Sequence, residues 1–281
     1  MNKLARMLKK VPGILKREGW GGVFRRVLQK LHVVTTKADP LTLYSFIMDR
    51  KKIALNKEAY NKHKNDQVKV LNWVIPEMGE GSGGHTTIFR FISNLEKRGF
   101  HSRVYLFRAD RFFDNKTLRK FTATSFPILD SKVELYYDVK YMKFAHATFA
   151  TSWDTAYFVR NFDNTISKFY FVQDFEPYFY AHGSDYQFAE RTYAFGLRGI
   201  TAGDWLKEKL NKEYGMKTDS FRFSYQKDVY YPVPRKDRKR RVFFYARPVT
   251  PRRDFELGLL ALNEVCRRMP DVEVIFAGWN L

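Results

Sequence analysis

The sequence predicts an α/β protein built on a parallel sheet. Lys69–Pro76 is a short apolar run typical of a strand, and a glycine-rich segment follows it. Helical periodicity then covers Thr86–Arg98, and a second strand-like run covers Ser102–Phe107. A strand–helix–strand order of this kind is a βαβ unit, which places its strands in parallel. The alternation continues to residue 213 and begins again near residue 241, so two α/β domains are expected.

Composition is that of a folded protein with an anionic partner. Of the 281 residues, 44% are hydrophobic and 28% are charged, which allows a sizeable core. The net charge of +20 favours nucleic acid, phospholipid head groups or phosphorylated small molecules as partners. Cys266 is the single cysteine, which excludes an internal disulfide and agrees with a reducing compartment. No long apolar run or secretory signal is present, so a cytoplasmic location is expected.

Residues 1–34 are predicted to form basic amphipathic helices. Apolar residues recur at helical spacing, and Pro12-Gly13 and the glycines between residues 19 and 22 divide the segment. Up to residue 32, nine basic residues face one acidic residue, Glu18. Basic amphipathic helices are typical of peripheral binding to an anionic membrane, here the inner face of the cell membrane. The alternative is a basic helix packed on its own protein.

A polar helical connector is expected at residues 35–67, and a first domain at 68–234. Beyond the first βαβ unit, the domain should contain a possible short strand at Phe126–Ile128, helical structure at Val139–Lys143, a strand at Ala147–Thr151, a helix at Thr155–Arg160, a strand at Lys168–Val172, a helix at Phe188–Ala194, a strand at Gly199–Ala202 and a helix at Trp205–Glu213.

A basic linker at residues 235–241 should precede a second domain at 242–281. Its expected elements are a strand at Arg241–Ala246, a helix at Asp254–Arg268 and a strand at Val272–Ala277. The helix should turn its apolar face inward: Leu257, Leu260, Ala261, Val265 and Cys266. Two strands do not make an independent domain, so this one is expected to be incomplete.

Two segments could bind phosphate groups. Glycines in Glu77–His85 would let backbone N–H groups approach an anion at a helix N-terminus, although a plain tight turn explains them equally well. The pattern is neither a dinucleotide fingerprint nor a Walker loop. Arg247 ends a predicted strand, and Arg252 and Arg253 precede the next helix. Guanidinium groups there suit a diphosphate, with solvated surface arginines as the alternative.

Four stretches resemble glycosyltransferases of family 4, which have the GT-B fold with two Rossmann-like domains. They are Gly83-Gly84-His85 with Lys97–Phe100, Ile200–Leu206, Asp228–Pro232, and Tyr245–Arg247 with Arg252-Arg253. The resemblance covers Lys69–Leu281 and is closest to bacterial rhamnosyltransferases of surface-glycan biosynthesis.

The resemblance implies a hexosyltransferase, and no resident cofactor is expected. It would move a sugar, with L-rhamnose expected, from a nucleotide-sugar donor such as dTDP-L-rhamnose to a growing lipid-linked glycan. Gly83 and Gly84 would lie against the donor diphosphate. Arg247 and one of Arg252 or Arg253 would neutralise that diphosphate as it leaves.

Four residues are candidates for the catalytic site. The family usually has His-Asp at the end of a middle strand, where this sequence has Gln173 and Asp174. Asp174, Glu176 and Asp154 follow predicted strands, where they could bind an acceptor hydroxyl or the sugar. His85 could contact either substrate, although a lone histidine is more often a capping or packing residue. The other histidines show no ligand-like spacing, so no metal site is expected.

The family also has a Glu-x7-Glu element in the second domain, and nothing after Leu281 supplies it. The chain alone is therefore expected to bind donor weakly and to turn over poorly, if at all. Two alternatives remain: a non-catalytic remnant that binds membrane or a partner, and a basic nucleic-acid-binding protein. No recognisable DNA- or RNA-binding module supports the second, so no nucleic acid is expected as a partner.

Overall fold

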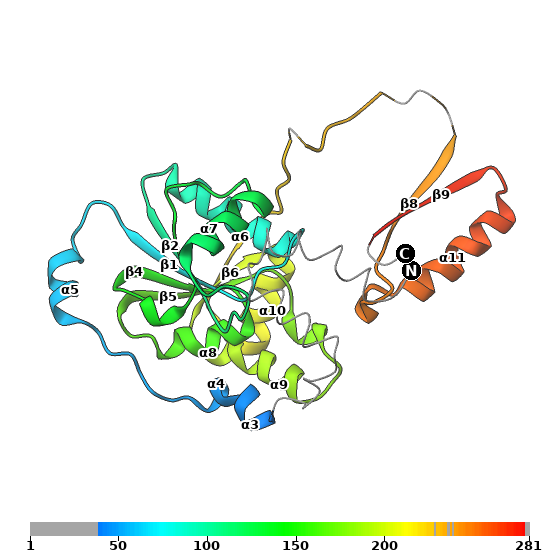
Figure 1. Ribbon diagram of the computed structural model, residues 1–281. Coiled ribbons are helices and arrows are strands. Elements are labelled where there is room, and N and C mark those ends of the chain that lie inside the picture. Colours follow the sequence, from blue (N-terminus) through cyan, green and yellow to red (C-terminus); the bar gives the residue numbers. More distant parts are fainter. Residues whose placement is uncertain (1–38, 228, 235–236, 238, 279–281) are drawn as a thin grey trace, which may run out of the picture. The chain divides into compact units, whose positions relative to one another are not determined.

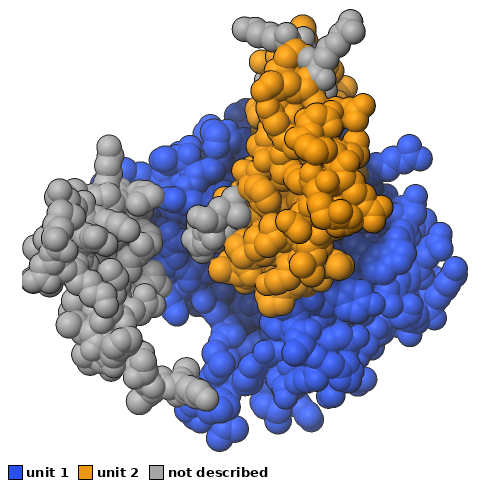
Figure 2. Space-filling model, turned by 90° about the vertical axis from the view of Figure 1, so that its right-hand side faces the viewer, with its two compact units in different colours: residues 1–222 blue, residues 223–281 orange. Residues whose placement is uncertain are grey.

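The computed structural model describes residues 39–227, 229–234, 237 and 239–278. The chain forms two compact units, which divide between Arg222 and Phe223, ahead of the expected linker at 235–241 (Figure 2). The predicted amphipathic helices at 1–34 lie outside the described residues, as do Arg235, Lys236 and Arg238 of that linker. Each unit is described by itself below.

Unit 1 contains a seven-stranded sheet in which every pair of neighbours is parallel (Figure 1). The strands are β1 (Val70–Ile75), β2 (His101–Leu106), β3 (Glu134–Tyr136), β4 (Ala145–Ala150), β5 (Thr165–Val172), β6 (Arg198–Ala202) and β7 (Thr218–Phe221). Their spatial order is β3-β2-β1-β4-β5-β6-β7, which extends the Rossmann order by one strand. The predicted α/β fold with a parallel, Rossmann-like sheet is confirmed.

Helices cover both faces of this sheet. Helices α6 (Gly83–Glu96) and α7 (Asn115–Ser125) lie on one face, and α8 (Trp153–Asn161) and α10 (Asp204–Tyr214) lie on the other. Because successive side chains on a strand point to opposite faces, Trp73 packs with the first pair of helices and Val74 with the second. The first core is dominated by aromatic rings, including the Trp73–Phe149 stack at 4.1 Å between centroids.

The segment before β1 runs along α8 (Figure 1). It contains the short helices α3 (Pro40–Leu43), α4 (Ser45–Met48) and α5 (Lys57–His63), so the expected connector is helical only in part. Between α4 and α5, Ile53 is extended and forms a parallel bridge with Phe162. At the other end, the Tyr44 hydroxyl donates to Asp185 at 2.7 Å, which fixes the segment to α9 (Ser184–Arg191).

Three local predictions for unit 1 need correction. Helix α6 begins at Gly83 and not at Thr86, because Ser82 caps it. The strand expected at Phe126–Ile128 is wrong: Phe126 caps the end of α7, which the sequence did not reveal. Strands β3 and β7 were also missed, because edge strands of three and four residues leave little apolar alternation.

Unit 1 also contains short turns of 3-10 helix. They are η1 (Val139–Tyr141), η2 (Glu176–Phe179) and η3 (Thr192–Ala194).

Unit 2 is a strand–helix–strand unit, as predicted. It consists of β8 (Arg240–Ala246), the 3-10 turn η4 (Pro251–Arg253), α11 (Phe255–Arg268) and β9 (Val272–Gly278), with the two strands parallel. Among its described residues, only Ala246 is buried.

The inward face expected for α11 is wrong in its main part. Leu257 and Leu260 are 68% and 69% exposed, and Ala261 is exposed as well. The helix instead turns Gly258 toward the sheet, where a Cβ would lie 2.4 Å from the Phe244 ring. The close approach at Gly258 rotates the leucine-rich face outward, while Val265 and Cys266 remain half-buried.

Candidate functional site

The candidate site lies at the carboxyl ends of β1, β4 and β5. The chain leaves β1 toward β2 on one side and returns to β4 on the other, so the order of the strands reverses between β1 and β4. In open α/β sheets, ligands bind in the crevice at such a reversal. The segments that follow these three strands carry six of the sequence-predicted site residues, at the same edge of the sheet: Gly83, Gly84, His85, Asp154, Asp174 and Glu176.

The glycine-rich segment forms a turn and then the first turn of α6. Gly81 has a φ of +70°, a left-handed conformation that favours glycine. The Ser82 hydroxyl accepts the His85 N–H at 3.4 Å and so caps the helix. Gly83 and Gly84 are exposed, and no group among the described residues accepts a hydrogen bond from their N–H groups. Two free N–H groups at the positive end of a helix can bind an anion.

Neither Gly83 nor Gly84 is required by the packing of the protein itself. Both lie outside the left-handed region, and a Cβ at Gly83 would meet nothing within 4 Å. A Cβ at Gly84 would make an ordinary contact, 3.5 Å from Gln173 Nε2. The missing side chains therefore leave open surface beside the helix N-terminus. The Gln173 contact also shows that the end of β5 lies next to this terminus.

His85 is an uncharged member of the site at neutral pH. Burial lowers the pKa of its imidazole to about 4, with a backbone hydrogen bond to Pro76 partly opposing the shift. Its Nδ1 lies 2.8 Å from the Ser82 hydroxyl, and its ring packs near Phe89 and Phe126. His85 therefore brings no positive charge to a ligand, and its Nε2 is buried with no hydrogen-bond partner among the described residues.

Glu176 joins the segments that follow β4 and β5. It is only 6% exposed, and its Oε2 accepts the Trp153 N–H at 2.8 Å while Oε1 accepts the Tyr170 hydroxyl at 2.7 Å. Burial raises the pKa of Glu176 to about 8, and the charges of Asp154 and Asp174 add to the shift. Both carboxyl oxygens are engaged within the protein, so Glu176 fixes the relative position of the two segments.

The other two candidate carboxyl groups differ in exposure. Asp154 is half-buried in the first turn of α8, where it accepts hydrogen bonds from the Ser152 hydroxyl and, at 2.9 Å, from the Thr155 N–H. Burial raises its pKa. Asp174 is exposed and accepts the N–H of Phe175 at 2.8 Å. Of the three carboxyl groups, Asp174 is the one most open to a ligand.

Trp153 is part of this edge and was missed by the sequence reasoning. Its indole Nε1 donates to the Tyr180 hydroxyl at 2.8 Å, and its ring lies 5.8 Å from Phe46 of α4. The signal available in the sequence was a tryptophan directly after a strand, between Ser152 and Asp154. An aromatic residue at that position is typical of a ligand crevice as well as of a core.

The three candidate arginines belong to unit 2. Arg247 follows β8, is half-buried, and donates through Nη1 to the Tyr245 hydroxyl at 2.8 Å. Arg252 and Arg253 are exposed in η4, immediately before α11. Cationic side chains thus gather at the carboxyl end of β8, an arrangement that can pair with phosphate oxygens. Among the described residues no cluster of metal-ligating side chains was found.

Comparison with known proteins shows similarity to a curated protein and to a solved structure. The chain is 32% identical over 218 residues to the O-antigen biosynthesis protein RfbC of Myxococcus xanthus, a match that covers 75% of this chain. The chain spans 17% of the length of that relative. A sucrose-phosphate synthase from Thermosynechococcus elongatus superposes with a TM-score of 0.42 and 11% identity, over 75% of this chain and 70% of that one. No protein-family model matches the chain.

Proposed function

We propose that this chain is part of a GT-B glycosyltransferase of family 4 that acts in the assembly of a bacterial surface polysaccharide. The relative named as an O-antigen biosynthesis protein supports a role in the assembly of a surface polysaccharide. The Rossmann-like order of the strands in unit 1 agrees with it.

The observation that carries the proposal is the exposed Gly83-Gly84 pair at the N-terminus of α6. It lies where the strand order reverses, and its open N–H groups suit the diphosphate of a nucleotide sugar. Neither glycine is needed for turn geometry or packing, so a close approach by a ligand explains both. Arg247 and one of Arg252 or Arg253 would neutralise the diphosphate as it leaves.

The proposed reaction transfers L-rhamnose from dTDP-L-rhamnose to a growing lipid-linked glycan. Backbone amides and cationic side chains would stabilise the leaving diphosphate, without a protein nucleophile. Asp174, as the exposed carboxylate, would bind the acceptor hydroxyl or the sugar. Asp154 and His85 would contribute hydrogen bonds to the substrates, and Glu176 would hold the segments that carry Trp153 and Asp174.

The proposed location is the cytoplasmic face of the membrane. Residues 1–34 would bind the anionic lipid surface through their basic helices, where the lipid-linked acceptor is found. None of the helices among the described residues combines the length and the apolar character needed to cross a bilayer.

Donor binding and sugar transfer test the proposal together. The full chain would be titrated calorimetrically with dTDP-L-rhamnose, UDP-glucose and GDP-mannose, and transfer to a lipid-linked glycan followed by mass spectrometry. We expect binding of dTDP-L-rhamnose and the addition of one deoxyhexose. Absence of binding to every nucleotide sugar, with specific RNA retention in a filter assay at moderate salt, would favour the nucleic-acid alternative.

A further inference from the structure

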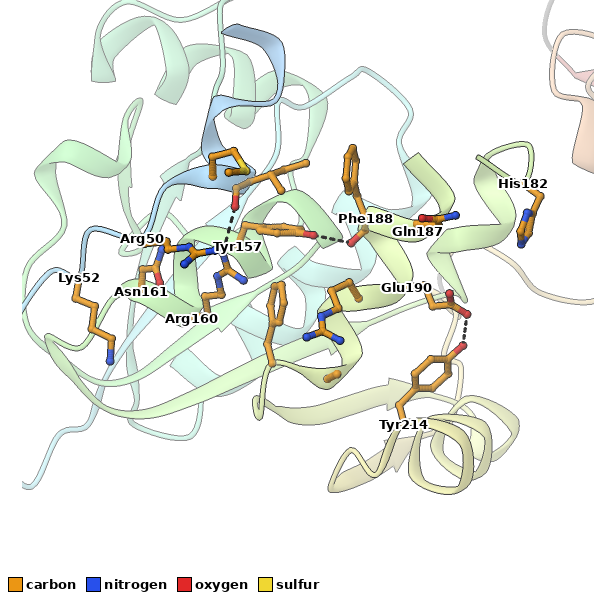
Figure 3. Close-up of a pocket in the computed structure, with 15 residues that line it drawn as sticks. Arg50, Lys52, Tyr157, Arg160, Asn161, His182, Gln187, Phe188, Glu190 and Tyr214 are labelled. Atoms are coloured by element: carbon orange, nitrogen blue, oxygen red, sulfur yellow. Dashed lines mark hydrogen bonds between the residues drawn. The ribbon is translucent and has the colours of Figure 1, made fainter. Parts of the chain in front are cut away.

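A second group of cationic residues in unit 1 lies outside the candidate functional site. It lines an open cavity of about 1100 Å³, bounded by α4, α8, α9 and η3 (Figure 3). Four basic residues line it, Arg50, Lys52, Arg160 and Arg191, against one acidic residue, Glu190. Lys52 pairs with Asp163 at 3.6 Å, which leaves the three arginines against Glu190. None of the sequence-predicted site residues lines this cavity.

Arg160 is held in a fixed position at the wall of the cavity. Its guanidinium lies 4.3 Å from the Phe195 ring centroid and 4.8 Å from that of Tyr157, and Nη2 donates to the Ile47 carbonyl at 3.3 Å. Its Nε is buried and has no hydrogen-bond partner among the described residues. A buried donor without an acceptor is destabilising, so the hydrogen-bonding capacity of this guanidinium is not fully satisfied within the described residues.

The positive charges at the cavity are only partly neutralised within the described residues. Burial lowers the pKa of Arg160, the charges of Arg50 and Arg191 lower it further, and Tyr157 and Asp49 oppose the shift. Figure 3 shows Arg50 beside Arg160, whereas Glu190 is engaged by the Tyr214 hydroxyl at 2.8 Å. Within the described residues, the nearby Asp163 pairs with Lys52 and Lys168, and no acidic side chain forms an ion pair with any of the three arginines. Residues 1–38 hold ten basic residues and one acidic residue, so they cannot balance the charge.

Apolar surface borders the same cavity. Ile47, Phe188 and Phe195 line it, and Met48 lines it while remaining 71% exposed. On the adjoining helix α3, Leu41 is 83% exposed. Cationic forks beside exposed aliphatic side chains match a molecule that joins a phosphate to a hydrocarbon chain.

We propose that this cavity binds the phosphate group of a lipid, with Arg50, Arg160 and Arg191 pairing with the phosphate oxygens and Met48 against the hydrocarbon chain. Two sources present this chemistry: the head group of a membrane phospholipid, and the diphosphate of a lipid carrier. The inference does not rest on the proposed transfer reaction, because the binding requires no sugar donor.

The test uses soluble lipids, so that binding of residues 1–34 to a bilayer plays no part. The full chain would be titrated with dihexanoyl-phosphatidylglycerol below its micelle concentration, with farnesyl diphosphate and with inorganic pyrophosphate. The cavity variant is Arg50→Glu with Arg191→Glu, both at exposed positions. The control is Lys97→Glu with Arg98→Glu at the exposed end of α6, which lowers the net charge from +20 to +16 as the cavity variant does.

We expect the cavity variant to bind at least one of the two lipids about tenfold or more weakly, as the loss of charge-assisted contacts implies, and the control to bind as the wild type does. A loss for both lipids assigns the cavity to lipid phosphates in general, and a loss for farnesyl diphosphate alone assigns it to a lipid carrier. Any binding of these ligands at a donor site is the same in the wild type and in both variants, so it does not affect the comparison of their affinities. Circular dichroism checks that both variants fold.

Three results would overturn the inference. They are unchanged lipid binding by the cavity variant, an equal loss in the control, and a wild-type protein that binds pyrophosphate but neither lipid. Arg160→Lys gives a second readout, because lysine keeps the charge but lacks the planar fork; it should weaken lipid binding by less than the double variant.

Discussion

Helices α6 and α11 occupy equivalent positions in two strand–helix–strand units, yet they differ completely in burial. Both have 14 residues and an apolar face, and both connect parallel strands. Helix α6 buries Ile88, Phe89 and Ile92, whereas α11 has no buried residue. The local sequence pattern is therefore sufficient to form a βαβ unit but not to bury it.

The neighbours of the two central strands explain the difference. Strand β1 lies between β2 and β4, and helices cover both faces of its sheet. Strand β8 pairs with β9 alone among the described residues, and its Phe243 and Tyr245 are 65% and 55% exposed. The site residues of unit 1 are thus held by a packed core, while those of unit 2 rest mainly on local contacts.

The largest expected effect tests this contrast directly. Phe89→Ala should lower the free energy of unfolding by about 3–5 kcal/mol, because it removes a fully buried ring. The matched change Leu260→Ala in α11 should lower it by less than about 0.5 kcal/mol, because that side chain is already exposed. Urea denaturation of both variants measures the two values. Equal losses would contradict the contrast.

Glu176 provides the next largest effect, through pH. Its pKa in the folded protein is about 8, above the value of 4.5 expected when unfolded. Between these two values the folded state holds a proton that the unfolded state has lost, so stability falls as pH rises from about 4.5 to about 8. Glu176→Gln has no such proton, and its amide can still bond to Trp153 and Tyr170.

The variant should therefore gain roughly 2–4 kcal/mol relative to wild type between pH 5 and pH 8. Denaturation of both proteins at the two pH values measures this gain. Parallel pH profiles would show that folding does not raise the pKa of Glu176.

A smaller effect is expected where the segment before β1 docks on α9. Tyr44→Phe removes the hydroxyl that donates to Asp185, which should destabilise the protein by about 0.5–1.5 kcal/mol. Tyr225→Phe is the control, because that side chain is 60% exposed in unit 2. Hydrogen exchange of α3 and α4 should increase only in the first variant. Unchanged exchange in both would mean that the segment is held by Phe46 and its ring contacts alone.

The smallest effect is expected at the glycine pair. Gly84→Ala adds a methyl group that makes only ordinary contact with Gln173, so the free energy of unfolding should change by less than about 0.5 kcal/mol. Thermal or urea unfolding measures it. A large loss would mean that packing, and not ligand approach, requires glycine there.

Much of unit 1 could be predicted because its strands are apolar and its helices periodic. The run from Val70 to Ile75 and the helix after it were placed within three residues. Strands β3 and β7 could not be found, because pairing at the sheet edge and not composition makes them strands. In α11, the choice between Gly258 and Leu260 as the sheet-facing residue depends on the close approach of Phe244, which a periodic pattern does not contain.

The site was predicted in position more than in chemistry. Predicting where the strands end was enough to place Asp154, Asp174 and Glu176 at one edge of the sheet. The sequence did not reveal that Glu176 is buried while Asp174 is exposed. That difference depends on Tyr170 and Trp153, which hydrogen-bond to Glu176 from separate segments. The low pKa of His85 likewise follows from tertiary burial.

The affinity of dTDP-L-rhamnose for the wild type, Gly84→Ala and Gly79→Ala is the most direct test of the central claim. Gly79 is an exposed glycine in the same segment, outside the left-handed region, and a Cβ there would meet nothing within 4 Å. If the N-terminus of α6 binds the donor diphosphate, the dissociation constant should rise about tenfold or more for Gly84→Ala and stay unchanged for Gly79→Ala. Equal dissociation constants for all three proteins would contradict the assignment of this helix terminus to the donor.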